Sequence, residues 1–471
     1  MAVWSEVFLR NAARASRFDP EYFQPHFLEA EALLSRLQSE VVPLGNLVVD
    51  GYRVVYENTE ILSEPFDPKR HVKYLQAANV SSGFPVIRAE EMGWVDISDW
   101  ERYEKGRIRR GELLVEVKGK AEKVTLVPND FPDEILVSGT LYKMLLDESR
   151  VDARYVLVYL LGKFGTLFRN RSKSNILVAY VNKDELYGIP IPIALNDFQQ
   201  SIAQAYVQAE AKYREAQTFY AEAEILLLDA LGLNNLDAAN ALTYEADFLA
   251  VAVAGRFDPD YFQPKYTRVR EALAKLPDCK IVPLENIVVE LTNGQTPLHH
   301  DLSVGEIPFL TAEHVADFRI NFDSAKRILA EHHARLLKRT RLKSEDVLIT
   351  IKGRVGNAAV VENLPGPANI NQDVAVMRLQ EGVPPYYLAG FLNCLAGKLL
   401  TEQVCTGQIN PFLGLGNLKT VPIPIFSLAE MQRLAELVRN KIGEAFAAAQ
   451  DAKNLLEVAK QRVEELIEEG A

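Results

Sequence analysis

Residues 17–25 read RFDPEYFQP, and residues 256–264 read RFDPDYFQP. Eight of the nine positions are identical, and the ninth exchanges one acidic residue for another. A match this long within one chain is not a product of chance. Because a long internal match indicates a repeated architecture, this stretch predicts that the chain holds two copies of one fold.

The repeat continues beyond the nonamer. Three further pairs of segments match, namely 42–44 with 282–284, 112–120 with 346–354, and 189–193 with 421–425. By contrast, residues 50–110 and 290–340 match poorly. The two halves therefore share a common fold pattern but carry different variable regions. This is typical of two related modules that recognise two different targets.

The middle of each half is expected to form β-strands. Residues 112–117 and 346–351 are short apolar runs rich in branched side chains, each followed by Lys-Gly, a pattern that favours buried strands. Residues 124–127 and 358–361 are expected to be the next strands.

Each half ends in a long heptad pattern. In the first, apolar or small residues alternate at spacings of four and three: Ile202, Tyr206, Ala209, Tyr213, Ala216, Tyr220, Ala223, Leu227 and Ala230. The second pattern is Met431, Ala435, Val438, Ile442, Ala445, Ala449, Ala452, Leu456, Ala459, Val463 and Leu466. Such seams predict coiled-coil helices over 197–231 and from 427 to the C-terminus. The simplest pairing is with each other, and a pseudo-twofold repeat makes that pair antiparallel.

Bulk properties narrow the class of protein. The chain has 471 residues, enough for about two to four domains. It shows neither a secretion signal nor an apolar run long enough to cross a bilayer, and its three separated cysteines do not form a metal or disulfide pattern. We therefore expect a cytoplasmic protein without membrane association.

The charge pattern is uneven. The net charge is −12, which argues against a simple DNA coat. Residues 325–354, however, hold nine Lys and Arg against three acids, a local charge of +6. Residues 102–123 and 163–173 each carry +4. Basic clusters inside both modules favour nucleic-acid binding over an ordinary solvated face.

Several segments resemble the specificity subunits of type I restriction–modification systems. They are Thr406-Gly407-Gln408-Ile409-Asn410, Leu418–Ile425 and Leu428–Gln432 in the second half, with Ser172–Asn175, Leu186–Pro192 and Asp197–Gln200 as the first copy. Asn293-Gly294-Gln295-Thr296-Pro297 is similar to a loop near the start of that family's target recognition domains, and Glu345–Thr350 to its central strand. The first half departs from the loop pattern with Asp50-Gly51-Tyr52-Arg53.

The resemblance covers nearly the whole chain and implies an α+β protein. Two tandem homologous α/β target recognition domains are separated by two long helices that form an antiparallel coiled coil. The expected boundaries are 1–196 and 233–426 for the domains, and 197–232 and 427–471 for the spacer helices. Each domain would read one half of a split DNA target.

The expected partners follow from the same resemblance. They are double-stranded DNA, two copies of the methyltransferase subunit and, where a cleavage subunit exists, endonuclease subunits. The chain itself would be a non-catalytic part of a phage-defence complex. It would hold no cofactor, since S-adenosylmethionine belongs on the partner methyltransferase.

Candidate DNA contacts combine basic side chains for phosphates with amides and a histidine for bases. They are Arg53, Gln76, Asn79, Arg109, Lys118, Lys120, Arg169, Arg171, Lys173, Gln295, Thr296, His314, Lys338, Arg339, Arg341, Lys352 and Arg354.

Enzyme motifs are weak. Val383-Pro384-Pro385-Tyr386 lacks the polar first residue of an amino-methyltransferase motif and is expected to start a helix. Glu116-Val117-Lys118 resembles half of a metal-dependent nuclease site, but the second copy has Thr350 in place of the acid. His299-His300 and His332-His333 lack metal-ligand spacing.

An alternative of a different class remains open. The chain could be a non-catalytic scaffold whose two modules bind protein, or the specificity factor of another phage-defence assembly.

Overall fold

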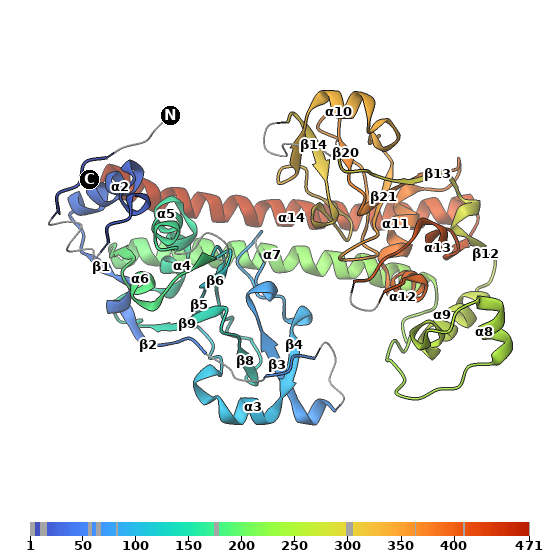
Figure 1. The fold of residues 1–471 in the computed structure, drawn as a ribbon, viewed down its shortest axis with the longest axis horizontal. Coiled ribbons are helices and arrows are strands. Elements are labelled where there is room, and N and C mark those ends of the chain that lie inside the picture. Colours follow the sequence, from blue (N-terminus) through green and yellow to red (C-terminus); the bar gives the residue numbers. More distant parts are fainter. Residues whose placement is uncertain are drawn as a thin grey trace. The chain divides into compact units, whose positions relative to one another are not determined.

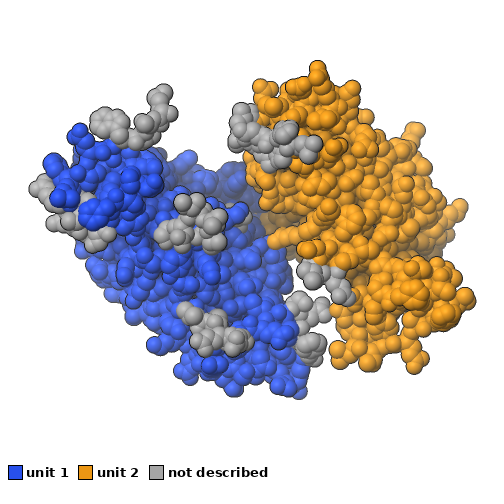
Figure 2. Space-filling model, viewed as in Figure 1, with its two compact units in different colours: residues 1–214, 448–471 blue, residues 215–447 orange. Residues whose placement is uncertain are grey.

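The computed structural model describes residues 5–9, 17–54, 59–62, 67–81, 83–173, 179–297, 305–362, 364–407 and 410–470. Figure 2 colours its two compact units, of which the first comprises residues 1–214 with 448–471 and the second residues 215–447. Each unit takes a part of each long helix. The four-part division at 196, 232 and 426 stays a prediction.

The first unit contains a central four-stranded antiparallel sheet and a smaller mixed sheet. The central order is β2 (Val48–Tyr52), β9 (Leu141–Leu146), β5 (Leu113–Glu116), β7 (Val124–Leu126). The smaller order is β4 (Gly93–Asp96), β3 (His71–Leu75), β8 (Ile135–Val137), with β3 and β8 parallel. Two further pairs are β1 (Val41–Pro43) with β11 (Pro190–Pro192) and β6 (Lys118–Gly119) with β10 (Ala179–Tyr180).

The short helices of this unit lie before, between and after the strands of the central sheet, and all of them precede the long helix α7 in the chain (Figure 1). They are α2 (Pro25–Arg36), α3 (Ile97–Arg102), α4 (Ala153–Leu161), α5 (Lys163–Arg171) and α6 (Lys183–Tyr187), followed by the first part of α7 (Asn196–Ala230). The last part of α14 (Leu428–Glu469) completes the unit.

The second unit repeats this plan. Its central sheet runs β13 (Val288–Asn293), β21 (Val374–Leu379), β18 (Val347–Thr350), β19 (Ala358–Val360), and its smaller sheet β17 (Lys326–Ile328), β14 (Ile307–Leu310), β20 (Asn369–Ile370). The remaining pairs are β12 (Lys280–Pro283) with β22 (Pro422–Ile425) and β15 (Val315–Ala316) with β16 (Arg319–Ile320). The helices are α8 (Phe248–Ala254), α9 (Pro264–Ala274), α10 (Ala330–Arg335), α11 (Pro385–Asn393), α12 (Leu395–Val404) and α13 (Leu415–Lys419).

The repeated sequence segments occupy matching places in the two units. Val42-Pro43 pairs with the Pro-Ile-Pro strand in the first unit, as Val282-Pro283 does in the second. The Tyr155 hydroxyl donates to the carbonyl of Pro192 at 2.8 Å, and Tyr387 donates to the carbonyl of Pro424. The duplication predicted from the nonamer is therefore a duplication of the fold.

The strand at the centre of each main sheet is buried on both faces. Leu113 and Val115 of β5 lie in the core formed with the helices, whereas Leu114 lies in the core formed with the smaller sheet. In β18, Val347 and Ile349 likewise lie in the core formed with the helices, whereas Leu348 lies in the core on the opposite face of the sheet. Because successive side chains of a strand point to opposite faces, a strand between two layers must be apolar throughout. This explains the continuous apolar runs from which the strands were predicted.

The structure confirms the predicted α+β fold, and its two long helices pack against each other. In the first unit Arg462 of α14 donates to the Ser201 hydroxyl of α7 at 3.0 Å. In the second unit the rings of Tyr220 and Phe446 lie 6.4 Å apart, and Lys441 pairs with Glu222 at 2.9 Å. Ascending numbers on α7 therefore face descending numbers on α14, which makes the pair antiparallel within that unit. The pseudo-twofold relation of the units stays a prediction.

The predicted seam of the second long helix needs two corrections. Ala448 and Ile467 are buried, whereas the expected Ala449 and Leu466 are only partly buried. An α-helix with 3.6 residues per turn drifts against a strict seven-residue repeat, so the neighbouring residue comes to face the partner helix. In the described part of the chain, no helix is both long and apolar enough to span a membrane.

One local expectation is confirmed. Pro385 is the first residue of α11, with Pro384 at its N-cap, so the Pro-Pro-Tyr segment starts a helix as predicted. Gly414 is the N-cap of the short helix α13, which begins at Leu415.

The alanines of the seam should be intolerant of larger side chains. Ala209 is fully buried in the first unit's core, so we expect Ala209→Leu to lower the free energy of unfolding by about 1–3 kcal/mol through overpacking. Ala211 is exposed on the same helix, and Ala211→Leu should change stability by less than about 0.5 kcal/mol. Chemical denaturation of both variants measures the difference, and equal midpoints would contradict the packing of this seam.

Candidate nucleic-acid interface

One edge of the central sheet is built in the same way in both units. Val117 donates its N–H to Thr140 at 2.9 Å, and Ile351 donates to Asp373 at 2.8 Å. From the other side, Val181 donates to Val117 at 3.0 Å and Leu413 to Ile351 at 2.9 Å. These matching main-chain bonds make residues 117, 140 and 181 equivalent to 351, 373 and 413. We call this region the strand-end edge.

A cation and an aromatic ring lie together at each strand-end edge. Lys118 pairs with Tyr180 across β6 and β10, and Lys352 pairs with Phe412 by an equivalent bridge. The ammonium of Lys352 lies 5.4 Å from the Phe412 ring centre, and the guanidinium of Arg53 lies 4.9 Å from that of Tyr180. Both distances permit cation–π attraction. Tyr180 and Phe412 were missed in the sequence, although their separation of 232 matches the offset of the repeat there.

The basic loop after the central strand is held by the strand's last side chain. In the first unit the buried Glu116 carboxylate accepts the N–H groups of Lys120 at 3.3 Å, Glu122 at 2.9 Å and Lys123 at 3.2 Å. In the second unit Thr350 takes this place, and its hydroxyl accepts the N–H of Asn357 at 3.0 Å. Glu116 therefore shapes a loop, which explains its position without a role in a nuclease site.

Gly119 is required inside this loop. Its φ is 120°, and a Cβ at this position would lie 2.8 Å from the Glu116 carboxylate. Around it, Lys118 and Lys120 are exposed, as are Lys352 and Arg354 in the second unit. Lys352 has a long contact of 3.9 Å with Asp373. Each unit thus presents two basic side chains from a loop that its own strand fixes.

A third position of the edge carries different side chains in the two units, and both side chains donate to an equivalent main-chain carbonyl. The Nε of Arg53 donates to the Gly139 carbonyl at 2.8 Å, and the side-chain amide of Asn293 donates to the Gln372 carbonyl at 3.2 Å. By the register above, residues 139 and 372 are equivalent. A guanidinium in one unit and an amide in the other are therefore held by the same main-chain acceptor.

The Gly-Gln-Thr-Pro loop of the second unit is also fixed at this edge. A Cβ on Gly294 would lie 1.9 Å from the Ile370 carbonyl oxygen, so only glycine fits. The Thr296 hydroxyl donates to the Gln372 side chain, while Gln295 remains exposed. The structure thus brings Gln295 and Thr296 to the edge that also carries Lys352.

Other predicted contacts lie elsewhere and are partly engaged. Arg109 pairs with Asp50 and Glu112, and the hydrogen bond to Asp50 raises its pKa. Arg341 is half-buried and donates to the carbonyls of His333 at 3.1 Å and Ala334 at 2.9 Å. The remaining four divide into the exposed Lys338 and Arg339 and the half-buried Gln76 and Lys173, and burial lowers the pKa of Lys173.

Four predicted contacts are buried and bonded internally, so as placed they cannot reach DNA. Arg169 donates to the Glu122 carbonyl at 2.7 Å, and Arg171 donates to the Tyr22 carbonyl at 2.8 Å. The Asn79 side chain donates to the Glu91 carbonyl at 2.7 Å, and His314 lies 3.1 Å from the Ser324 carbonyl. Counting charges along the sequence overestimated the number of exposed basic side chains in the first unit. Such a count does not show that Arg169 and Arg171 lie on the buried face of α5.

Some residues of the motifs named in the sequence analysis are not described by the structure. Ser174, Asn175, His299, His300 and the pair Gln408-Ile409 lie outside the described residues. Among the residues that the structure does describe, no group of three or more His, Cys, Asp or Glu is placed to hold a metal ion.

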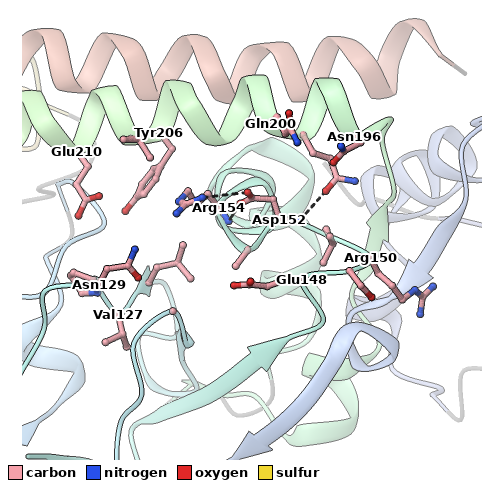
Figure 3. A pocket seen from close by; sticks show the side chains of 18 of the residues that line it. Val127, Asn129, Glu148, Arg150, Asp152, Arg154, Asn196, Gln200, Tyr206 and Glu210 are labelled. Atoms are coloured by element: carbon pink, nitrogen blue, oxygen red, sulfur yellow. Dashed lines mark hydrogen bonds and ion pairs between the residues drawn. The ribbon is translucent and has the colours of Figure 1, made fainter. Parts of the chain in front are cut away.

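A polar hollow of about 860 Å³ lies in the first unit beside α7 (Figure 3). None of the predicted DNA contacts lines it. Arg214 of α7 contacts Asp130, in the loop after β7, at 2.5 Å, and contacts Glu210 of its own helix at 3.1 Å. The second unit has a comparable pair between Arg439 of α14 and Glu362 at 2.7 Å. These pairs tie a long helix to the loop after the outer strand of the sheet.

Comparison with known proteins gives structural matches only. No family model matches the chain, and no curated protein matches it. Over 92% of its length the chain matches the S subunit of a type I restriction-modification system from M. genitalium, with 96% of that chain covered, 13% identity and a TM-score of 0.41. The HsdS subunit from Thermoanaerobacter tengcongensis matches over the same share, with 97% of that chain covered, 15% identity and a TM-score of 0.29. A chain from a structure of the assembly and conformational transition of the type I R-M system matches with 98% covered, 16% identity and a TM-score of 0.30.

Removing the acceptor at Glu116 should loosen the basic loop. Glu116→Ala leaves three N–H groups without their acceptor, and we expect the free energy of unfolding to fall by about 1–3 kcal/mol. Hydrogen exchange of the amides of residues 120–123 should also become faster. Glu134→Ala, at an exposed position of the same unit, is the control. Unchanged exchange in the Glu116 variant would show that this carboxylate does not hold the loop.

Proposed function

We propose that this chain is the DNA-specificity subunit of a type I restriction–modification complex. Each unit reads one half of a bipartite target, and partner subunits carry out methyl transfer and cleavage. The observation that carries the proposal is the strand-end edge, which is built alike in both units but displays different side chains. A shared frame with different displayed groups is what the reading of two unlike half-sites requires.

The basic loops supply the sequence-independent part of this recognition. Lys118 and Lys120 in one unit, and Lys352 and Arg354 in the other, are exposed on loops of fixed shape. Exposed Lys and Arg neutralise phosphates, which gives affinity and fixes the register of a protein on the duplex. The exposed Lys338 and Arg339 add to this set in the second unit. The buried Arg169 and Arg171 are left out of the proposed interface.

The side chains beside these loops supply the base-reading part. Arg53 and Asn293 occupy equivalent positions. Arg53 donates to the Gly139 carbonyl and, at 2.6 Å, to the Tyr180 hydroxyl, and Asn293 donates to the Gln372 carbonyl. The remaining polar atoms of each head group are the ones proposed to meet base edges. Arginine pairs best with guanine and asparagine with adenine in the major groove. Gln295 adds an exposed amide beside Asn293. Different bases are therefore expected in the two half-sites.

The partners complete the proposed assembly. With a net charge of −12, the chain gains long-range attraction to DNA only near its basic loops. Methyltransferase subunits, which would hold S-adenosylmethionine, add the remaining phosphate contacts, and the antiparallel helices set the gap between the half-sites. The complex acts in the cytoplasm, where phage DNA enters.

The proposal is tested by mapping methylated bases in the genome of the organism that carries the gene, before and after its deletion. We expect methylation to disappear from one motif that consists of two short blocks around a fixed gap, and complementation with the intact gene should restore it. If the map is unchanged while the partner methyltransferase is expressed, the chain does not guide methylation. A protein-binding scaffold would then be the better description.

The phosphate contacts are tested by the salt dependence of DNA binding. For the chain purified with its partner subunits, Lys352→Ala combined with Arg354→Ala should reduce the slope of log K against log salt by about 2, since each phosphate contact contributes about 0.9. Lys275→Ala, at an exposed position just after α9, should leave the slope unchanged. If the double variant and the unmodified protein gave equal slopes, the loop that carries Lys352 and Arg354 would not belong to the interface.

A further inference from the structure

Each unit contains a segment that consists of the nonamer, a helix and a short strand. We call these residues, 17–43 and 256–283, the repeated segments. In both units the nonamer is nearly identical, and the strand pairs with a Pro-Ile-Pro strand. These shared contacts do not distinguish one unit from the other, so they do not tie a repeated segment to its own unit.

A buried side chain anchors each repeated segment at the same point. In the first unit Arg171, at the end of α5, donates to the Tyr22 carbonyl at 2.8 Å. In the second unit Gln403, near the end of α12, donates to the Tyr261 carbonyl at 3.1 Å. Both carbonyls belong to the sixth residue of the nonamer. Arg171 and Gln403 are therefore equivalent, and we call α5 and α12 the core helices.

The second partner of this anchoring side chain is reversed in polarity between the units. Arg171 forms an ion pair with Glu31 of α2 at 2.5 Å. Gln403 instead accepts two N–H groups of Arg270 of α9, at 2.8 and 3.0 Å. Glu31 and Arg270 are each the sixth residue after their nonamer. The guanidinium thus lies on the core helix in one unit and on the repeated segment in the other.

A further ion pair adds to this difference in the second unit. The buried Lys265 of α9 contacts both carboxylate oxygens of Glu402 on α12, at 3.1 and 3.2 Å. The first unit has His26 and Asn170 at the equivalent positions. The second repeated segment is therefore basic where it meets its core helix, whereas the first meets its core helix with the acid Glu31.

The second repeated segment does not fit the core helix of the first unit. On α5, Arg270 would face Arg171, so two guanidiniums would meet. Arg171 is buried and would also lose the carboxylate of Glu31. A buried charge that loses its partner is strongly destabilising, so this pairing is disfavoured.

The first repeated segment does not fit the core helix of the second unit either. On α12, the carboxylate of Glu31 would face the side-chain oxygen of Gln403, and two acceptors do not form a hydrogen bond. Rotation of the amide would present its N–H groups to Glu31 but would break the bond to the main-chain carbonyl. Glu402 would also lose Lys265.

The order of the chain leaves room for wrong pairing. The core of the first unit includes Ala452 and Val463 of α14, so both repeated segments have been synthesised before that core is complete. Arg171 is closer along the sequence to Arg270 than to Glu31, and closing a shorter loop costs less entropy. Exchange between copies is a characteristic error of repeat proteins.

We propose that the reversed polarity of the Arg171–Glu31 and Gln403–Arg270 contacts selects the pairing within the chain. Each repeated segment binds the core helix of its own unit, and the other repeated segment is excluded. The shared parts of the segments supply the contact, while the reversed pair supplies selectivity between two similar partners. The inference concerns the assembly of this chain and does not require the strand-end edges to bind DNA.

A photoreactive residue at position 170 of the full-length chain reports which segment lies on α5. Asn170 is exposed beside Arg171, and mass spectrometry of the cross-linked monomer distinguishes the two segments. Glu31→Arg combined with Arg270→Glu gives each segment the charge of the other. In chains isolated from cells, we expect capture of residues 256–283 to rise about tenfold or more over the unmodified chain, since the buried Arg171 then finds its acid there.

The matched control exchanges charges on the same two helices at other positions. Glu29→Arg combined with Arg268→Glu makes the same change of charge at exposed positions. Capture at position 170 should then stay with residues 17–43, as in the unmodified chain. Capture of the second segment in this control would show that helix charge in general, and not the buried contact, governs the pairing, which would overturn the proposal.

A rescued variant adds Arg171→Gln and Gln403→Arg to the exchange at 31 and 270. It rebuilds both contacts with their polarity transferred between the units. Capture should return to residues 17–43, and the midpoint of chemical unfolding should return to that of the unmodified chain.

Two results would overturn the proposal. One is capture of residues 17–43 alone in the variant exchanged at 31 and 270, because the contacts would then stabilise the units without selecting the pairing. The other is failure of the rescued variant to recover folding and correct capture. The rescued variant also decides the question if the first variant does not fold, since recovery on transfer of the polarity supports the proposal.

Discussion

The first unit depends on a helix that lies more than two hundred residues further along the chain. Ala452, Ala459 and Val463 of α14 are buried in the same core as Ile202 and Ala209 of α7. The N-terminus of α5 is also tied to this helix, since Glu464 accepts the N–H of Lys163 at 2.7 Å. Residues 1–214 therefore cannot bury their core alone. Long-range closure of this kind delays folding, so the unit is completed only after the C-terminus has been synthesised.

Within each unit, the central strand of the main sheet is buried on both faces and positions the loop of the proposed interface. Leu114 faces the small sheet, while Leu113 and Val115 face the helices. A strand clamped between two layers has little freedom to shift its register. Its end therefore appears at a defined place, and the loop that follows is shaped by Glu116 in one unit and by Thr350 in the other. The rigidity of the proposed interface is a consequence of burial elsewhere.

Much of the fold was predictable because it rests on periodicity and repetition. The strand runs and the two long helices follow from spacing alone, and their observed bounds differ from the expected ones by one or two residues. The candidate site was predictable only in part. A count of charges placed Arg169 on the surface, although desolvation lowers its pKa to about 10 within the core. Tyr180 and Phe412 were missed because their role depends on pairing between segments far apart in sequence.

The anchorage of Arg53 and Asn293 on a carbonyl has an evolutionary meaning. A peptide oxygen is present whatever the sequence, so any side chain with a suitably placed N–H can use it. Replacement at this position therefore need not disturb the sheet that carries it, and under the proposed function stability and base selectivity become separable properties of one residue. A chain built in this way can drift from one preference to another through intermediates that all fold, and its two halves can do so independently.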